Sequence, residues 1–505
     1  MGQEGQKKAS VVACLLLLLG ILLGSSSVYW AMSNGFVAPN QYFDAIPSTA
    51  YYTVRFDGSY LYNVKWNGKI DGTPSSDLTT QINYAIVNAP SGSSIVIAEN
   101  SAVLTLSDYV LLNKDINFYS YAKLKVANSF PTWKVFDVHA HNVDIYLYEL
   151  DGNKANNPSQ EFNAFEISGS ENLRIKTHNK NFGYGDVYFK GSASEPNRNI
   201  QLQIQSENNG GVGFNAGVYL GANNDDITIS GNYYNVTGNG GQVIYNTATL
   251  GIVRVRDLDV RHYNSTGSGK PVIDARANTI TFIDNVEISL TTQNLALVVA
   301  STAEVYATNL RMLNIGVSGT LSAIENHGIF VGSNVKIDTA TDKGIWTRGG
   351  SDWLSLTNFD IRSTTSYGIM VHSDSGGNHT VTNGQIIGAY GIADAVASAS
   401  KKSAFSNVDV SGVTTDWARM NGAYGVTIIG FKFYNSGKTS AKDGESISHG
   451  LGDSPTCVIA TANTAKIIVA VTAIYSTQFV VSMNWDNGTA VSTYYYIYWY
   501  VEIRP

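Results

Sequence analysis

Three polar residues near position 140 have the types and the spacing that metal chemistry needs. Asp137, His139 and His141 alternate with apolar residues. Alternate side chains of a β-strand lie on one face of it, so a strand here would present one carboxylate and two imidazoles side by side. Such a set can bind a transition metal. The other interpretation is an ordinary solvated outer face.

Carboxylates gather at two further places. Asp225 and Asp226 end the most acidic turn of the chain. Paired carboxylates can act as acid and base in glycoside hydrolysis or can hold Ca²⁺. The sequence establishes no cofactor, and Ca²⁺ is the candidate. The second place has alternating charges on one expected exterior strand: Arg254, Arg256, Asp257 and Asp259. Such charges usually face water or pair with neighbouring strands, and a catalytic role is the alternative.

The elements that must position these residues repeat along the chain. A polar turn residue followed by apolar, any and apolar residues recurs in steps of 23 to 28 residues between positions 257 and 430. Most of the turn residues are asparagines: Asn285, Asn309, Asn334, Asn358, Asn383 and Asn407. Asn172, Asn199 and Asp226 start looser versions, so the pattern is blurred before residue 257.

This repeat fits a rung of three short strands and three bends, with a rise of about 4.8 Å between rungs. Asparagine tolerates a left-handed backbone at a tight bend, and stacked amides bond to one another. The sequence therefore predicts an all-β fold, a single-stranded right-handed parallel β-helix. We expect the asparagine ladder to face the interior of the bend and function to reside on the outward residues.

The two ends of the repeat have a different texture. Residues 77–88 show apolar residues at helical spacing; Ser75, Ser76 and Asp77 supply an N-cap, and Pro90 with Gly92 ends the pattern. We expect this helix to cap the first rung, because an open end would expose the core. The β-helix is assigned to residues 61–436, and residues 437–505 predict a small C-terminal β-sandwich module.

The N-terminus predicts export. Residues 1–32 read as a signal peptide or an N-terminal membrane anchor, because Lys7 and Lys8 precede the apolar run Val11–Leu23 and then small residues. Residues 33–60 read as a linker. We expect an extracellular or cell-surface protein that contacts a membrane only through this segment. Four sequons are compatible with glycosylation outside the cell, although an Asn- and Thr-rich chain forms them by chance: Asn235, Asn264, Asn378 and Asn487.

Charge limits the partners. Only 14% of residues are charged, and the net charge is -7. There is no basic stripe, so we expect no nucleic-acid partner. The charge also gives an acidic polysaccharide no obvious electrostatic help. The two cysteines, Cys14 and Cys457, leave no intrachain disulfide once a leader is removed.

The segment that starts at Trp66-Asn-Gly-Lys-Ile70 and continues to Ile95-Val-Ile97 resembles the N-terminal part of pectate-lyase-like proteins, and the asparagine ladder resembles their rungs. The resemblance covers about residues 60–435 and implies the β-helix fold. It does not specify an activity, since that superfamily includes lyases, glycosidases, viral spikes and non-catalytic adhesins. The catalytic order of polygalacturonases is broken here, because Arg174-Ile-Lys176 precedes the acidic turn.

The C-terminal module contains His449-Gly450-Leu451 and resembles modules that end some spike and tail-fibre proteins, which implies a homotrimer or glycan binding. Its last strand alternates aromatic residues on both faces: Tyr494, Tyr496, Tyr498 and Tyr500 on one, Trp499 on the other. These rings could stack on sugars or contact other subunits. The alternative is a central strand that is covered on both faces.

Two functions remain. The favoured one is a non-catalytic surface protein that binds polysaccharide, another glycan or other subunits, since no complete catalytic set can be assembled from the sequence. The alternative is a polysaccharide lyase or glycoside hydrolase that acts on an exterior groove. Three or more carboxylates that converge with an Arg or His in one groove across neighbouring rungs would favour the enzyme.

Overall fold

The computed structural model describes residues 50–502, with gaps at 99–101, 159–161, 211–215, 222, 239–241, 248–250, 266–269, 277, 291–294, 316–321, 350–351, 396–402, 421–426, 430–433, 449–456, 463, 465 and 476–477. The predicted leader and most of the predicted linker lie outside these residues. Among the described residues no helix is long and apolar enough to cross a membrane.

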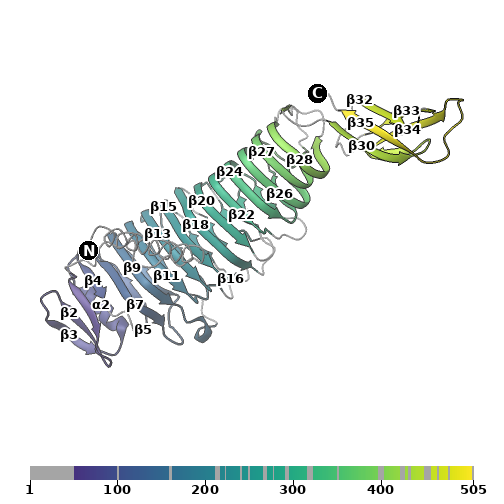
Figure 1. Cartoon of the computed structure of the whole chain (residues 1–505). Coiled ribbons are helices and arrows are strands. Elements are labelled where there is room, and N and C mark those ends of the chain that lie inside the picture. The colour runs from purple at the N-terminus through teal and green to yellow at the C-terminus, as the bar shows by residue number, and fades with distance from the viewer. Residues whose placement is uncertain are drawn as a thin grey trace, which may run out of the picture. The chain divides into compact units, whose positions relative to one another are not determined.

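The chain begins with a small antiparallel sheet and one helix. Strands β1 (Tyr52–Phe56), β2 (Leu61–Lys65) and β3 (Ile70–Ser75) pair antiparallel, and β1 also pairs in parallel with β4 (Ser94–Ile97). Helix α2 (Leu78–Asn88) starts at Asp77, whose side chain accepts two backbone N–H groups. It buries Leu78, Ile82, Ala85 and Ile86 against the first rungs and so forms the predicted cap (Figure 1). The predicted linker ends earlier than residue 60, since β1 belongs to the main sheet.

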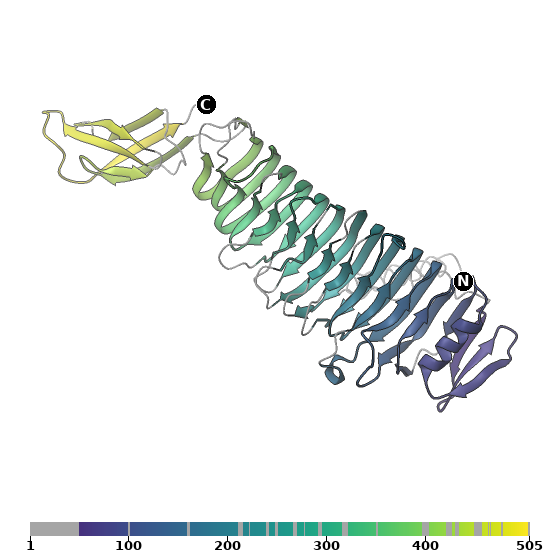
Figure 2. The same cartoon turned by 180° about the vertical axis from the view of Figure 1, so that it is seen from behind.

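From β4 to β29 the described strands form a right-handed parallel β-helix of about 10 turns. Figure 2 shows the stack from behind, with each strand beside its counterpart in the next rung. One sheet consists of short strands: β6 (Val110–Leu112), β8 (Lys134–Val138), β10 (Asn163–Ile167), β12 (Gly185–Phe189), β14 (Ala216–Leu220), β17 (Gln242–Asn246), β19 (Ile273–Ala275), β21 (Leu297–Val299), β23 (Ser322–Asn326) and β25 (Lys343–Thr347).

The rest of each rung is a longer strand, beginning with β7 (Asn117–Val126). The next of these strands bend at the ladder position: β9 (His141–Asp151), β11 (Glu171–Lys180), β13 (Asn197–Glu207), β15 (Asn224–Tyr234), β18 (Ile252–Ser265), β20 (Ile280–Leu290), β22 (Glu304–Leu313) and β24 (Ile329–Ala340). In the last rungs one strand continues from the long part into the short-strand sheet: β26 (Trp353–Val371), β27 (His379–Asp394) and β28 (Ser403–Met420). Shorter elements accompany them: β5 (Val103–Leu106), η1 (Lys154–Asn156), β16 (Thr237–Gly238) and β29 (Thr427–Ile429). Inward residues of all rungs form one continuous apolar core.

The asparagine ladder lies at the bends of the long strands. All six predicted asparagines have φ between 52° and 59°, the left-handed region that asparagine tolerates. The same backbone recurs upstream at Asn142, Asn172, Asn199, Asp226 and Asp257, so the ladder does not fade before residue 257. Hydrogen bonds between side-chain amides join neighbouring rungs: Asn172 donates to Asn142 (2.9 Å), Asn199 to Asn172 (2.6 Å), Asn334 to Asn309 (2.7 Å) and Asn407 to Asn383 (2.8 Å).

The prediction that the ladder faces the interior of the bend is wrong. The side chains of all six asparagines are exposed. An apolar interior would leave part of each amide without a hydrogen-bond partner, whereas outside the bend water completes the stack. Function on the outward residues therefore has to share the surface with the ladder.

Replacing Asn334 tests the ladder. Asn334→Ala should lower the free energy of unfolding by about 1–2 kcal/mol, because alanine is strained in the left-handed region and cannot donate to Asn309. Asn334→Gly keeps the backbone and should lose clearly less. Urea titration of the two variants measures the difference. Equal losses would show that backbone conformation is not what selects asparagine here.

The C-terminal module consists of two three-stranded antiparallel sheets. One contains β30 (Tyr434–Ala441), β35 (Tyr495–Glu502) and β32 (Cys457–Ala462). The other contains β31 (Ser446–Ser448), β34 (Gln478–Trp485) and β33 (Ile467–Ile474). Between them lies a separate small core that includes Phe479, Met483 and Ile497. The module starts at Tyr434, slightly before the predicted boundary.

Candidate functional site

The short strands put a single line of side chains on the outside of the β-helix. In β8, Phe136 and Val138 point into the core, and Asp137 between them points outward. Parallel register carries this outward position from rung to rung. The outward line consists of Asp137, Glu166, Tyr188, Tyr219, Tyr245, Asp274, Val298, Glu325 and Trp346. We call this line, together with the side chains that contact it, the short-strand face.

Two carboxylates share one ammonium group at the N-terminal end of this face. Lys134 Nζ lies 2.7 Å from Asp137 Oδ2 and 3.2 Å from Glu166 Oε1. Burial alone would raise the pKa of Asp137, but His139 and Lys134 lower it below the ordinary value, so the group stays ionised. Lys190 Nζ approaches Glu166 as well, at 3.7 Å. The other Glu166 oxygen, Oε2, is buried and accepts no hydrogen bond from the described residues.

His139 lies between Asp137 and Ser168, but not as part of a nucleophilic triad. Its Nε2 is 2.9 Å from Asp137 Oδ1, and Ser168 Oγ is 2.9 Å from Nδ1 and 3.4 Å from Nε2. An oxygen that is so similarly distant from both ring nitrogens does not lie along the lone pair of either, so it is not placed to give up its proton there. The hydrogen bond to Asp137 raises the pKa of His139, although burial opposes it.

Stacked tyrosines occupy the middle of the face. The rings of Tyr188 and Tyr219 are 5.1 Å apart and nearly parallel, and those of Tyr219 and Tyr245 are 5.3 Å apart. Burial raises the pKa of Tyr188 and Tyr245, so both hydroxyls remain protonated donors at neutral pH. A cation lies at the end of the stack: the Arg276 guanidinium is 5.6 Å from the centre of the Tyr245 ring.

A ring, a cation and a carboxylate are combined twice in this part of the face. Arg276 Nε lies 2.9 Å and 3.0 Å from the two oxygens of Asp274. Arg348 Nη2 lies 2.6 Å from Glu325, and its guanidinium is 4.0 Å from the centre of the Trp346 ring. His327 Nε2 reaches the same carboxylate at 2.9 Å. Burial would raise the pKa of Glu325, but His327 and Arg348 lower it, so this carboxylate too is ionised.

On this face the cations lie outside and the carboxylates beneath them. The Arg276 side chain is 49% exposed and Asp274 is 0% exposed. The Lys190 side chain is 55% exposed and its partner Glu166 is 3% exposed. The Arg348 side chain is 36% exposed and its partner Glu325 is 8% exposed. A molecule that approaches the face therefore meets positive groups and aromatic rings first, although the whole chain is negative.

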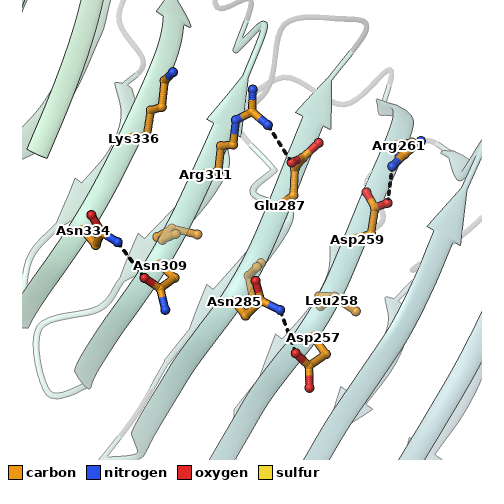
Figure 3. A pocket seen from close by; sticks show the side chains of 12 residues that line it. Asp257, Leu258, Asp259, Arg261, Asn285, Glu287, Asn309, Arg311, Asn334 and Lys336 are labelled. Atoms are coloured by element: carbon orange, nitrogen blue, oxygen red, sulfur yellow. Dashed lines mark hydrogen bonds and ion pairs between the residues drawn. The ribbon is translucent and has the colours of Figure 1, made fainter. Parts of the chain in front are cut away.

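A groove of about 510 Å³ lies on a different side, over the long strands β18, β20, β22 and β24 (Figure 3). It contains the predicted residues Asp257 and Asp259, together with Glu287, Arg261 and Arg311. Three carboxylates thus converge with arginines across neighbouring rungs, which is the arrangement that would favour an enzyme.

Each of these three carboxylates has a partner, although one oxygen of Asp259, Oδ1, is buried and accepts no hydrogen bond from the described residues. Asp257 accepts from Asn285 at 2.7 Å, Asp259 pairs with Arg261 at 2.7 Å, and Glu287 pairs with Arg311 at 3.1 Å (Figure 3). Both signs of charge are exposed here, since Arg311 is 47% and Glu287 33% exposed. None of the described residues that line the groove is aromatic. These features fit solvated pairing between rungs better than a binding site for a sugar chain.

The other predicted acidic residues are engaged separately. Asp226 takes the ladder position and pairs with Arg254 of the next rung. Asp225 accepts the backbone N–H of Ile252 at 3.2 Å. Arg256 is exposed, in register with Asp284. The acidic turn therefore does not present two carboxylates to one ligand.

The expectation that one strand carries Asp137, His139 and His141 on one face is wrong. Strand β8 ends at Val138, the chain bends, and His141 begins β9, where it pairs with Glu171. Only Asp137 and His139 are brought together. Among the described residues no group of three or more His, Cys, Asp and Glu side chains is arranged to hold a metal ion.

The last strand is a central strand, as one interpretation predicted, but one of its faces is open. Tyr494, Tyr496 and Tyr498 are 57%, 52% and 49% exposed. The side chains of Trp499 and Tyr500 lie outside the described ones. Of the sequons, Asn235, Asn378 and Asn487 are exposed, and the Asn235 amide also donates to Asn208. The side chain of Asn264 is not among those that the structure describes.

Sequence reasoning missed most of the short-strand face. The sequence does contain a signal. Several short strands end in a triplet that starts with a carboxylate or an aromatic residue and has a basic residue two positions later: Asp137-Val-His139, Asp274-Ala-Arg276, Glu325-Asn-His327 and Trp346-Thr-Arg348. These triplets become a site only when register stacks them.

Comparisons with known proteins show only distant similarity. No family model and no curated protein matches the sequence. Among solved structures, a tailspike protein mutant of Escherichia coli bacteriophage HK620 in complex with hexasaccharide is 11% identical, with a TM-score of 0.43 over 87% of this chain and 92% of that one. The A-module of the Azotobacter vinelandii mannuronan C-5 epimerase AlgE4 is 12% identical, with a TM-score of 0.30 over 70% and 90%. The tailspike gp49 of Pseudomonas phage LKA1 is 11% identical, with a TM-score of 0.27 over 82% and 66%.

Proposed function

We propose that this chain binds a linear acidic glycan along the short-strand face. The observation that carries the proposal is the repeated layering of an exposed cation over a buried carboxylate beside an aromatic ring, as in Arg276 with Asp274 and Tyr245. Such cations are held in position before a ligand arrives, so little side-chain freedom is lost on binding. Guanidinium groups suit carboxylates because they bond in a bidentate way.

The length of the face supports a chain-like ligand. From β8 to β25 the outward line crosses eight rung-to-rung steps, which is roughly 40 Å at the spacing of paired strands. Trp133 is 55% exposed at one end, with the ammonium groups of Lys134 and Lys190 about 6 Å from its ring. Trp346 and Arg348 mark the other end. Rings offer flat apolar surface to sugar rings, and the basic groups between them fix acidic substituents.

The setting we propose is the outside of the cell or its surface, reached through the predicted leader in residues 1–32. Mass spectrometry of the mature N-terminus would separate a cleaved signal peptide from a retained anchor. A homotrimer through the C-terminal module also belongs to the proposal, and sedimentation of the purified chain would test it.

A panel of immobilised glycans tests the proposed function directly. Polymers that carry uronic acid, sialic acid or sulfate should bind at low salt, and neutral polymers of equal length should bind much more weakly. Because exposed charges are screened by ions, raising the salt to about 1 M should weaken binding. Equal binding of neutral and acidic polymers would overturn the electrostatic part of the proposal.

Cleavage of the bound glycan is the second candidate, and the unpartnered Glu166 oxygen is what favours it. Two carboxylates on adjacent rungs resemble the acid pair of glycosidases, with Asp137 held ionised by Lys134 and His139. If this pair cuts the chain, Glu166→Gln should reduce the release of reducing ends by at least 100-fold and leave binding nearly unchanged. Asp259→Asn, in the groove, is the matched control. New reducing ends that persist in Glu166→Gln would exclude this pair.

Binding should also depend on pH through His139. The Asp137 partner raises the pKa of this imidazole, so the ring is charged over a wider range and its positive charge is lost as the pH rises through that pKa. The groups that face it are Asp137, Lys134, Glu166 and Ser168. Affinity for an acidic glycan should therefore increase between about pH 8 and pH 6, and His139→Gln should flatten this part of the profile. Calorimetry at several pH values measures it; an unchanged profile in His139→Gln would assign the effect elsewhere.

A further inference from the structure

The C-terminal module has an outer face of unusual composition. Its sheet of β30, β35 and β32 turns Tyr496 and Tyr498 outward, both about half exposed, and Tyr494 continues the line just before β35. Lys438 Nζ lies 4.3 Å from the Tyr496 ring centre and 5.6 Å from that of Tyr498. Lys442 Nζ lies 5.2 Å from the Tyr494 ring. We call these five residues the tyrosine–lysine face.

The charge of this face is one-sided. Neither lysine forms an ion pair with a carboxylate of the described residues. Strands β30 and β32 contain no acidic residue, and the one acid of β35, Glu502, is in register with Tyr434 and Cys457 at the far end. The short-strand face differs, because there each cation covers a carboxylate. The tyrosine–lysine face therefore leaves its positive charge for a ligand to neutralise.

A second copy of the face is a poor occupant. A two-fold symmetric contact would place the two lysines of one copy against the equally positive face of the other, and like charges that meet in an interface are strongly unfavourable. An occupant must supply negative groups for the ammonium donors and flat apolar patches for the half-exposed rings. A saccharide with carboxylate or sulfate groups has both.

We propose that the tyrosine–lysine face is a second binding site, separate from the short-strand face, for an acidic saccharide. The rings of Tyr496 and Tyr498 stand two residues apart on one strand, roughly 7 Å, so neighbouring sugar units can lie over neighbouring rings. Lys438, opposite Tyr498 on β30, holds its ammonium over that line and binds the acidic substituent.

The experiment uses the full chain carrying Arg276→Ala and Arg348→Ala, which disables the short-strand face. Trigalacturonate, a sulfated disaccharide and neutral maltotriose are titrated by calorimetry. We expect the acidic probes still to bind, and Lys438→Ala with Lys442→Ala in this background to bind them roughly tenfold more weakly. Tyr496→Ala with Tyr498→Ala should do the same. Tyr475→Ala and Lys466→Ala, exposed residues of the same module, are controls and should change nothing.

Three outcomes would overturn this inference. One is that no acidic probe binds once Arg276 and Arg348 are replaced, although the unmodified chain binds it; the short-strand proposal would then stand alone. Another is that maltotriose or a polyglutamate peptide binds this background as tightly as the acidic probes. The third is that the lysine variants change from a trimer to a monomer in sedimentation, which would make the face a subunit interface. If the unmodified chain itself bound no acidic probe, that result would instead refute the proposed function.

Discussion

Replacing Arg276 and Arg348 together by alanine should weaken the binding of an acidic polysaccharide by roughly 100-fold. Each guanidinium is the exposed partner of a buried carboxylate, and each would contribute about 1.5 kcal/mol through a charge-assisted hydrogen bond to the glycan. Their removal also uncovers Asp274 and Glu325, which repel an anionic ligand. Equilibrium binding at low salt measures the loss, and the difference from the unmodified chain should shrink as salt is added.

The matched control is Arg261→Ala with Arg311→Ala in the groove. Those two arginines also pair with carboxylates, but no described aromatic residue lines the groove with them, so binding should fall less than threefold. Circular dichroism and the melting temperature must show that both double variants are folded. This control is needed because Asp274 is fully buried, and removing Arg276 leaves its charge without that partner. A larger loss in the groove variant than in the Arg276 and Arg348 variant would move the binding site to the groove.

The second large effect is expected in the core, at Asp352. This aspartate is fully buried and accepts from Thr347 Oγ1 (2.6 Å), Ser375 Oγ (2.7 Å) and the backbone N–H of Gly376 (2.7 Å). Ser375 Oγ is also 2.7 Å from His379 Nε2. The network contains serine, histidine and aspartate, but the serine lies between the other two and all three are buried, so its role is structural.

Asp352→Ala should lower the free energy of unfolding by about 3–5 kcal/mol, since several buried donors lose their acceptor at once. Asp352→Asn keeps one acceptor oxygen and should lose less. Asp374→Ala is the control, because Asp374 is 57% exposed on the same turn and pairs with His372 at the surface. Urea titration measures the stabilities, and hydrogen exchange over residues 347–379 would localise the loss. An Asp352→Ala protein as stable as Asp374→Ala would contradict this account of the network.

The same network connects the core to the site. Its turn follows directly on His372, whose ring contacts Trp346 at 5.9 Å. Trp346 in turn supports Arg348. A variant that loosens the turn should therefore also weaken glycan binding at this end of the short-strand face, although it touches no ligand.

The fold could be read from the sequence because its strongest constraint is local. After glycine, asparagine is the residue that adopts a left-handed bend most easily, and one such bend in each rung leaves a spacing that can be counted. Asn309 and Asn334 show it clearly. The upstream bends were harder to see, because Asp226 and Asp257 replace asparagine and the step between them is longer.

The site could not be read in the same way, because it depends on register between rungs. Asp137 and Glu166 are far apart in the chain, and only the pairing of β8 with β10 makes them neighbours. His141 shows the opposite error: alternation placed it beside His139, but the bend between β8 and β9 ends the alternation. Net charge was misleading for a related reason. It counts buried carboxylates and exposed arginines equally, whereas a ligand meets the arginines.

The location of the glycan is tested most directly by the structure of the full chain with a bound acidic oligosaccharide of at least six units. We predict that the sugar lies along the short-strand face, with its acidic groups bonded to Arg276 and Arg348 and its rings over Trp133 or the tyrosine stack. An oligosaccharide bound in the groove of Asp257, Glu287 and Arg311, with the short-strand face empty, would contradict the central claim.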